Sequence, residues 1–280
     1  SSRARPSGRV PRLESHQPGD RGDEHPAPAG SHRTWDARPG GGLRGLLLLP
    51  LSALWMILAS GFVAVVAVVV PGWFRRRGWW MVRAWGRVPL WWHGVRLEVT
   101  GAERLEAAGP RLVLFNHVSI LDLFVLAATS PANTVVVYKQ EFHKIPGIGH
   151  ALKALGCIAV DRSDKERALA SMSAAAERIR SEGCTVYIAP EGTRSRKGGL
   201  QEFKLGAFHL AVQTGAPLVP LIMRGIPAVL PMGSFRIRSG RVGVDLLEPI
   251  EPTGWTTEGV RDHAAEVREV FLEYLAPVVD

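Results

Sequence analysis

Residues 112–122 read LVLFNHVSILD, an apolar run that ends in a polar turn and then resumes with helical spacing. The apolar part, residues 112–115, is typical of a buried strand. Ser119 and Asp122 form the S-x-x-D pattern that opens a helix. His117 therefore stands on the turn at the carboxyl end of a strand, where open α/β sheets hold their ligands.

The alternation of short strands and helices continues toward the end of the chain. Apolar, β-branched runs at residues 134–138, 158–160, 185–189 and 218–222 are predicted strands. Two amphipathic helices are predicted because apolar side chains recur on one face. These are Ala168, Met172, Ala175 and Ile179 within residues 164–182, and Val260, Ala264, Val267 and Phe271 near the C-terminus. This order of elements predicts that residues 93–280 form an α/β domain with a mixed, largely parallel sheet flanked by helices.

The segment before this domain divides into two parts. Residues 1–44 are rich in Pro, Gly, Arg, Ser and Asp, and they are predicted to form a disordered tail because they cannot bury enough apolar surface to offset their ordering entropy. Residues 46–70 form an uncharged run of 25 residues. Such a run is long enough to cross a bilayer core of about 30 Å. It is too long and too far along the chain for a cleaved signal peptide, so we predict an N-terminal membrane helix rather than a buried core helix.

Arginine and tryptophan follow the apolar run directly, a composition typical of the membrane interface. The residues are Arg75, Arg76, Arg77, Arg83 and Arg87, with Trp73, Trp79, Trp80, Trp85, Trp91 and Trp92. Residues 45–92 are therefore predicted to anchor the protein in a cell membrane. We favour a single span, with a helix pair that dips into one leaflet as the alternative. The cluster outweighs Arg33, Arg38 and Arg44 on the other flank, so the positive-inside rule predicts a cytoplasmic location for residues 93–280.

Composition narrows the class of protein. The 280 residues include 34 Lys and Arg against 26 Asp and Glu, which gives a net charge of +8. The sequence has no helix-turn-helix, zinc-finger or RNA-binding signature, and we expect no nucleic-acid partner. Cys157 and Cys184 lie in apolar stretches without metal-ligand spacing, and we expect buried, reduced thiols and no metal.

His117 is the first candidate catalytic residue, because an imidazole has the side-chain pKa best suited to proton abstraction near neutral pH. Asp122 is placed to accept a hydrogen bond from one ring nitrogen, which leaves the other nitrogen for a substrate hydroxyl. In the alternative interpretation, Asp122 only caps the helix. The chain has no G-x-S-x-G elbow, so we predict no nucleophile from the enzyme itself.

A second cluster follows the predicted strand at 185–189 and reads APEGTRS at residues 189–195. Gly192 allows close approach of the backbone, while Arg194 and Lys204 offer positive charge to a phosphate. The alternative is an ordinary glycine turn with a solvated Arg.

Four segments in order resemble the 1-acyl-glycerol-3-phosphate acyltransferase family of the glycerophospholipid acyltransferase superfamily. NHVSILD at 116–122 matches the family's NHxSxxD block. GCIAVDR at 156–162 is similar to its G-x-x-x-x-x-R block, PEGTRS at 190–195 to its EGTR block, and LVP at 218–220 to its last block. The resemblance covers residues 94–230, about half of the chain.

The resemblance implies that His117 is the general base and Asp122 its partner. It also implies that side chains after the other strands bind the phosphate of the acceptor. With Lys204 added for its charge, the predicted substrate-binding residues are Arg162, Glu191, Gly192, Thr193, Arg194 and Lys204.

The reaction implied by the resemblance is a direct acyl transfer. The sn-2 hydroxyl of lysophosphatidate, deprotonated by His117, attacks the thioester of acyl-CoA or acyl carrier protein and forms phosphatidic acid for phospholipid synthesis. The expected partners are membrane lipids, lysophosphatidate and the acyl donor, without a cofactor. Two alternatives are a sister acyltransferase that uses another lysophospholipid or an amino-acid-based lyso-lipid, and a non-catalytic membrane scaffold.

Overall fold

The computed structural model describes residues 42–107, 109–161, 165–194 and 199–276. Most of the tail predicted at residues 1–44, and the candidate phosphate ligand Arg162, lie outside the described residues. The predicted membrane segment begins inside the first helix, which starts at Gly42, three residues before the predicted boundary at residue 45.

A seven-stranded sheet runs through the domain in the order β1-β7-β6-β2-β5-β3-β4. Neighbouring strands are parallel except for β6 and β7, which confirms the predicted mixed, largely parallel sheet. The strands are β1 Val95–Thr100, β2 Arg111–Phe115, β3 Thr134–Lys139, β4 Ile158–Val160, β5 Thr185–Ile188, β6 Leu218–Arg224 and β7 Gly240–Leu246. The predicted strands correspond to β2 through β6; β1 and β7 were not predicted.

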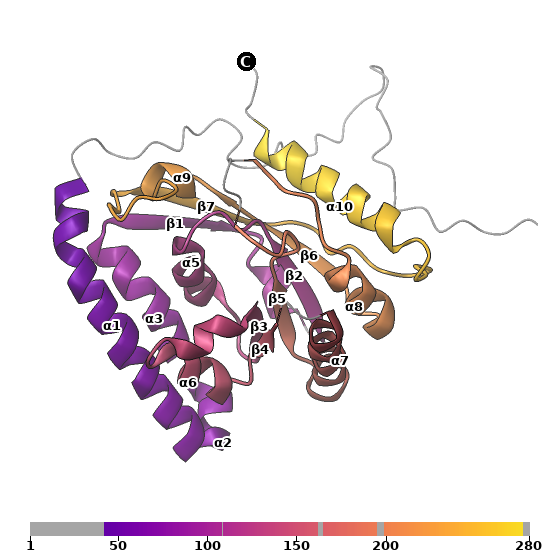
Figure 1. Ribbon diagram of the computed structural model, residues 1–280, viewed down its shortest axis with the longest axis horizontal. Helices are drawn as coiled ribbons and strands as arrows, with labels where there is room; N and C mark the ends of the chain where they lie inside the picture. The colour runs from indigo at the N-terminus through magenta and orange to yellow at the C-terminus, as the bar shows by residue number, and fades with distance from the viewer. Residues whose placement is uncertain (1–41, 108, 162–164, 195–198, 277–280) are drawn as a thin grey trace, which may run out of the picture.

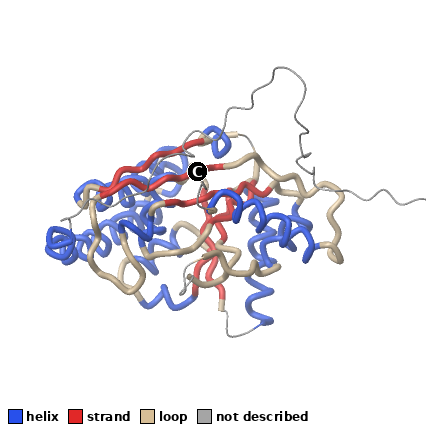
Figure 2. The backbone as a smooth tube through the Cα atoms, turned by 90° about the horizontal axis from the view of Figure 1, so that it is seen from above, coloured by secondary structure: helices blue, strands red, loops and turns tan. Residues whose placement is uncertain are grey.

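Helices lie on both sides of the sheet (Figures 1 and 2). Helices α7, α8 and α10 cover one face, while α3, α5 and α9 cover the other. The helices are α1 Gly42–Val69, α2 Pro71–Trp73, the π-helix η1 Phe74–Gly78, α3 Trp79–Trp92, α4 Glu103–Glu106, α5 Leu121–Thr129, the 3-10 helix η2 Gln140–Lys144, α6 Ile148–Ala154, α7 Lys165–Glu182, α8 Gly206–Thr214, α9 Ile226–Val229 and α10 Val260–Leu275. The two predicted amphipathic helices correspond to α7 and α10.

The central strand β2 shows how the sheet forms two cores. Leu112 and Leu114 are fully buried against the layer of α7, α8 and α10. Val113 and Phe115 point to the opposite layer, where they pack with residues of α5. Because successive side chains of a strand alternate between faces, a continuous apolar run is what a strand buried on both faces requires.

Helix α3 lies directly on α5, the helix that follows the LVLFNHVSILD segment. A Cβ built on Gly86 would lie 2.3 Å from the carbonyl oxygen of Phe124 and 2.6 Å from the backbone nitrogen of Ala128. Beside this contact, the rings of Trp85 and Phe124 stack with centroids 4.9 Å apart. Glycine at position 86 therefore permits a backbone-to-backbone approach that no larger residue would allow.

Helix α1 is the only described helix long and apolar enough to cross a membrane, over residues Leu43–Val69. It runs beside α3 and α6 along one side of the domain (Figure 1). Near its start, Gly45 lies against the carbonyl of Ile237, and farther along, the carbonyl of Ile57 lies against Gly147. The helix thus contacts the folded domain at two widely separated points.

Polar groups also join α1 to α3. Trp85 Nε1 donates to Ser60 Oγ at 2.9 Å, and Trp92 Nε1 donates to Ser52 Oγ at 3.2 Å. Trp79 is 7% exposed. Of the six Trp residues predicted to form an interfacial belt, Trp79 is buried and Trp85 and Trp92 are partly buried, whereas Trp73, Trp80 and Trp91 are exposed.

His93, directly after α3, belongs to the same polar contact. Its Nε2 lies 2.9 Å from Ser52 Oγ, which itself donates to the carbonyl of Leu48. Ser52 Oγ must therefore accept from His93, which places the imidazole proton on Nε2. Burial, together with the nearby charge of Arg44, lowers the pKa of His93 to about 4.

Candidate active site

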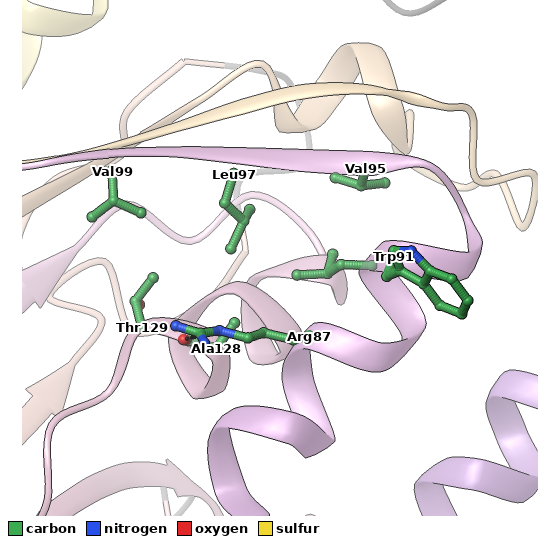
Figure 3. A pocket seen from close by; sticks show the side chains of 8 residues that line it. Arg87, Trp91, Val95, Leu97, Val99, Ala128 and Thr129 are labelled. Atoms are coloured by element: carbon green, nitrogen blue, oxygen red, sulfur yellow. Dashed lines mark hydrogen bonds between the residues drawn. The ribbon is translucent and has the colours of Figure 1, made fainter. Parts of the chain in front are cut away.

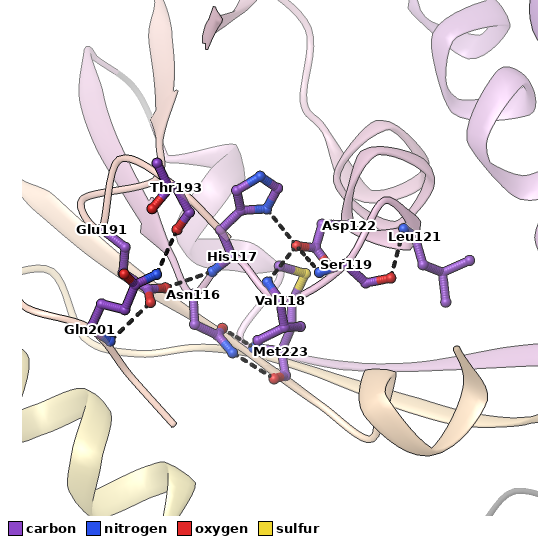
Figure 4. A network of polar contacts seen from close by, with 10 residues as sticks. All are labelled: Asn116, His117, Val118, Ser119, Leu121, Asp122, Glu191, Thr193, Gln201 and Met223. Atoms are coloured by element: carbon purple, nitrogen blue, oxygen red, sulfur yellow. Dashed lines mark hydrogen bonds and ion pairs between the residues drawn. The ribbon is translucent and has the colours of Figure 1, made fainter. Parts of the chain in front are cut away.

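Asn116 is where the chain leaves the sheet after β2. Its side-chain amide donates to the carbonyl of Met223 at 2.9 Å, and its Oδ1 accepts from the N–H of Met223 at 2.7 Å. The Asn116 side chain thus makes the two hydrogen bonds to the Met223 backbone in β6 that a continuing β2 strand would otherwise make, while the main chain turns away from the sheet. This turn projects His117 from the carboxyl edge of the sheet (Figure 4).

The predicted pair of His117 and Asp122 is in contact. His117 Nδ1 lies 2.7 Å from Oδ2 of Asp122 (Figure 4). The Asp122 side chain is fully buried, whereas that of His117 is 24% exposed. The other ring nitrogen of His117, Nε2, points away from Asp122 and has no hydrogen-bond partner among the described residues. This arrangement leaves Nε2 available to a ligand.

The same carboxylate oxygen of Asp122 also accepts two backbone hydrogen bonds. The N–H groups of Val118 and Ser119 donate to Oδ2 at 2.8 and 3.0 Å. Ser119 Oγ accepts in return from the N–H of Leu121 at 3.3 Å. Asp122 thus accepts from the N–H of Ser119 as in a capping box, although Ser119 Oγ accepts from Leu121 rather than from Asp122. The two interpretations offered by the sequence, imidazole partner and helix cap, therefore hold together in one side chain.

Glu191 joins the second cluster to the first, because β2 and β5 are parallel neighbours and their following turns meet. Its Oε1 accepts from the backbone N–H of His117 at 2.8 Å, and its Oε2 accepts from the N–H of Gln201 at 3.0 Å. The side chain is buried, and burial raises the pKa of the carboxyl. Its observed contacts are with backbone groups that shape the site.

Gly192 and Thr193 shape the turn after Glu191. Gly192 has a φ of +73°, and its N–H donates to the carbonyl of Ala189 at 3.0 Å. The left-handed conformation explains a glycine at this position. The carbonyl of Thr193 accepts from Gln201 Nε2 at 3.0 Å.

Two exposed cations stand beside this turn. Arg194 follows Thr193 directly, and the Cγ of Lys204 lies 3.4 Å from a Cβ built on Gly192. Neither side chain forms a hydrogen bond or ion pair with any residue in the described ranges. The structure thus brings seven of the eight predicted site residues to the turns after β2 and β5, and it does not describe the eighth, Arg162.

Two residues at the site were given no role from the sequence. Asn116 belongs to the first motif, and its position at a strand end directly before His117 is a usable signal. Gln201 binds both Glu191 and Thr193, but it comes ten residues after Glu191 and belongs to no motif. Within the described ranges, no group of three or more His, Cys, Asp or Glu residues is arranged to hold a metal.

Two open grooves lie away from His117. One, of about 330 Å³, lies under β1 and is lined by Arg87, Leu90, Trp91, Val95, Leu97, Val99, Ala128 and Thr129 (Figure 3). The other, of about 390 Å³, lies along α1 and is lined by Leu51, Leu54, Trp55, Leu58, Ala59, Phe62 and Trp92. The second groove is entirely apolar on its surface.

Known proteins share this fold and these sequence blocks. A family model described as Acyltransferase matches residues 96–224. A 1-acyl-sn-glycerol-3-phosphate acyltransferase of Limnanthes douglasii is 31% identical over 78% of this chain and 77% of its own length. The human protein named 1-acyl-sn-glycerol-3-phosphate acyltransferase alpha is 34% identical over 64% of each chain.

A solved structure supports the fold independently. The crystal structure of the 1-acyl-sn-glycerophosphate acyltransferase PlsC of Thermotoga maritima superposes with a TM-score of 0.69, and it covers 84% of this chain and 99% of its own at 24% identity. With the sequence relatives, the sheet and the ordered motifs, the chain belongs to the 1-acyl-sn-glycerol-3-phosphate acyltransferase family and is an acyltransferase enzyme.

Proposed function

We propose that this enzyme transfers a fatty acyl group from acyl-CoA or acyl carrier protein to the sn-2 hydroxyl of 1-acyl-glycerol-3-phosphate, which forms phosphatidic acid. The names of its relatives support this acceptor. The observation that carries the chemistry is the contact of 2.7 Å between His117 Nδ1 and the buried Asp122, since it leaves Nε2 of an oriented imidazole open to a hydroxyl.

His117 acts first as a base and then as an acid. Its Nε2 accepts the proton of the sn-2 hydroxyl while the hydroxyl oxygen bonds to the thioester carbonyl carbon. The buried carboxylate of Asp122 stabilises the imidazolium that forms. When the carbon–sulfur bond breaks, the thiolate receives the proton from Nε2, and the ester and the free thiol leave. The nucleophile comes from the substrate throughout.

Arg194 and Lys204 bind the phosphate of the acceptor in this proposal. Both are exposed at the turn after β5, and neither is neutralised by a carboxylate among the described residues. Glu191 does not bind the phosphate itself in this proposal, because its carboxylate would repel a negatively charged group. Its contribution is indirect: its hydrogen bond to the N–H of His117 fixes the turn that carries the base. Gly192 and Thr193 complete that turn, and Arg162 stays a predicted ligand.

For the membrane anchor, we propose the helix pair in one leaflet. Helix α1 contacts the folded domain at Gly45 and at Ile57, and three Trp N–H groups donate across the pair: Trp85 and Trp92 to serine hydroxyls, and Trp55 to the carbonyl of Trp85. A helix that crosses a bilayer cannot hold a polar domain along its middle. The outer face of α1 and its apolar groove then face lipid, with the domain on the cytoplasmic side near Arg75, Arg76 and Arg77.

The test is an acyl-transfer assay with purified protein in detergent. The protein is given labelled acyl-CoA and, in separate reactions, lysophosphatidate, lysophosphatidylcholine, lysophosphatidylglycerol and an ornithine-based lyso-lipid. Phosphatidic acid as the main product, formed at least a hundredfold more slowly by His117→Ala, is the expected result. A faster reaction with another acceptor would replace the proposed substrate and keep the proposed chemistry.

A further inference from the structure

We propose that residues 231–238, the α9–β7 loop, insert into an anionic lipid bilayer as a second membrane contact beside α1. This inference rests on the proposed membrane placement of the α1–α3 pair. The loop belongs to the domain that carries the active site, and it lies next to the start of α1 in Figure 1.

The first observation is an apolar tip that the protein leaves uncovered. Phe235 is 76% exposed and Met232 is 51% exposed. A single exposed apolar residue is ordinary on a protein surface, but a contiguous set of them marks an interaction site. The neighbouring start of α1, where Gly45 lies against Ile237, adds Leu43 and Leu47, which are each about 70% exposed.

The second observation is that the loop is held in shape by its own hydrogen bonds. The N–H of Ser234 donates to the carbonyl of Pro231 at 3.0 Å, with Gly233 between them at a φ of +75°. This is the geometry of a type II turn, which presents Met232 at its corner. The N–H of Arg236 then donates to Ser234 Oγ at 3.0 Å. Because the backbone of the tip already has a fixed shape, the loop loses little conformational entropy when it enters lipid.

The base of the loop is fastened to the domain and to α1. Ile237 is buried in the layer of α3, α5 and α9, and the N–H of Arg238 donates to the carbonyl of Val229 at 2.8 Å. The carbonyl of Ile237 is the group that Gly45 of α1 lies against. The position of the apolar tip relative to the outer face of α1 is therefore fixed. Both can then contact the same membrane surface at once.

The positive charge of the loop indicates that its partner is a negatively charged lipid surface. Residues 231–240 contain Arg236 and Arg238 and no acidic residue. Both arginines are exposed, and their guanidinium groups have no partner in the described part of the chain. An aromatic tip flanked by unpaired arginines fits the interface of a bilayer with negatively charged headgroups. It fits an apolar protein groove less well, because two guanidinium groups would lose water there without compensation.

The experiment measures binding of the full chain to vesicles of phosphatidylcholine, with and without phosphatidylglycerol. Phe235→Ser should weaken binding to both kinds of vesicle by about tenfold, which is the effect of one aromatic side chain leaving lipid. Arg236→Gln with Arg238→Gln should weaken binding only to the vesicles with phosphatidylglycerol, by about fivefold for each charge. Arg261→Gln on α10, across the sheet, is the matched control and should change neither.

A probe at the tip reports contact even if α1 dominates affinity. Phe235→Cys is labelled with a fluorophore in a Cys157→Ala background, because Cys184 is buried whereas Cys157 is partly exposed. Nitroxides on the lipid tails should quench this label and leave a label at Arg261→Cys unquenched.

Unquenched fluorescence at position 235 overturns the inference, whatever the vesicle affinity of Phe235→Ser. A change in sedimentation coefficient with normal vesicle binding would instead identify a contact between two copies, which also overturns it. Acyl transfer in detergent is measured on the same variants and should stay at the wild-type rate. Absence of transfer in the wild-type protein would refute the proposed reaction without affecting the vesicle result.

Discussion

The backbone N–H of His117 donates a hydrogen bond of 2.8 Å to Oε1 of Glu191, although the two residues are 74 positions apart. This bond joins the turn after β2, which carries the proposed base His117, to the turn after β5, which carries Arg194. One buried carboxylate therefore fixes the position of the proposed base relative to the proposed phosphate ligands.

Asp122→Asn should reduce turnover roughly 10- to 100-fold, the equivalent of one charge-assisted hydrogen bond. The N–H groups of Val118 and Ser119 both donate to Oδ2, so the amide oxygen must occupy that position and His117 keeps its proton on Nδ1. The loss should thus be smaller than the ~10⁴-fold loss that follows when an amide inverts the tautomer in a serine protease. His117→Ala should lose about 10²–10⁴-fold. Turnover and melting temperature are measured on the same preparations.

Glu191→Gln should lower the turnover measured at saturating concentrations of both substrates, and it should also lower the melting temperature of the protein. An amide accepts only through its oxygen, so one of the two N–H groups, of His117 or of Gln201, would face an NH₂ group. Glu202→Gln, an exposed neighbour, should behave as the wild type. A higher Michaelis constant for the acceptor with unchanged turnover would instead place Glu191 in the phosphate site.

Arg194→Ala should lower kcat/KM for lysophosphatidate by about 10- to 100-fold, because a charge-assisted phosphate contact contributes about 1.5–3 kcal/mol. The Michaelis constant for acyl-CoA should change little. Lys204→Ala should act in the same direction, whereas Arg261→Ala, on the far helix α10, should have no effect. An unaltered response to lysophosphatidate in both site variants would remove these cations from the acceptor site.

The folded protein should lose stability as the pH falls from about 6.5 towards 4, partly through His93. An unfolded histidine takes up a proton near pH 6.5, but burial lowers the pKa of His93 to about 4 in the folded state. The unfolded state therefore binds more protons in this window, and the cost reaches roughly 1–3 kcal/mol. His93→Gln keeps the donor to Ser52 and cannot titrate, so its melting temperature should fall less between pH 7 and pH 5 than that of the wild type. His150→Gln, an exposed histidine, should show the wild-type slope.

Local sequence was sufficient to predict those parts of the structure that depend on residues close together in the chain. The strand at 112–115, the turn and the pair of His117 and Asp122 all fall within eleven residues, and they were predicted together. The edge strand β1 was not predicted, because Arg96 and Glu98 break its apolar pattern and its pairing partner β7 lies more than 140 residues away.

Contacts across the chain were beyond the reach of local patterns. The sequence grouped Glu191 with the phosphate ligands, but it holds no signal that this carboxylate accepts the N–H of His117. The hydrogen bond between Asn116 and Met223 joins residues 107 positions apart, and no local sequence pattern indicates it either. The folding of residues 45–92 back onto the domain depends on small residues, such as Gly45 and Gly86, whose role is visible only once their neighbours are known.

The contact of Gly86 with Phe124 and Ala128 has a practical consequence for engineering. Asp122 lies in the first turn of α5, and α3 is the neighbour on which α5 rests. Cutting the chain before residue 93 would strip α5 of that support and expose its apolar side. A water-soluble enzyme has to be made by replacing exposed residues such as Leu47, Leu54 and Leu58 with polar ones, with α3 retained.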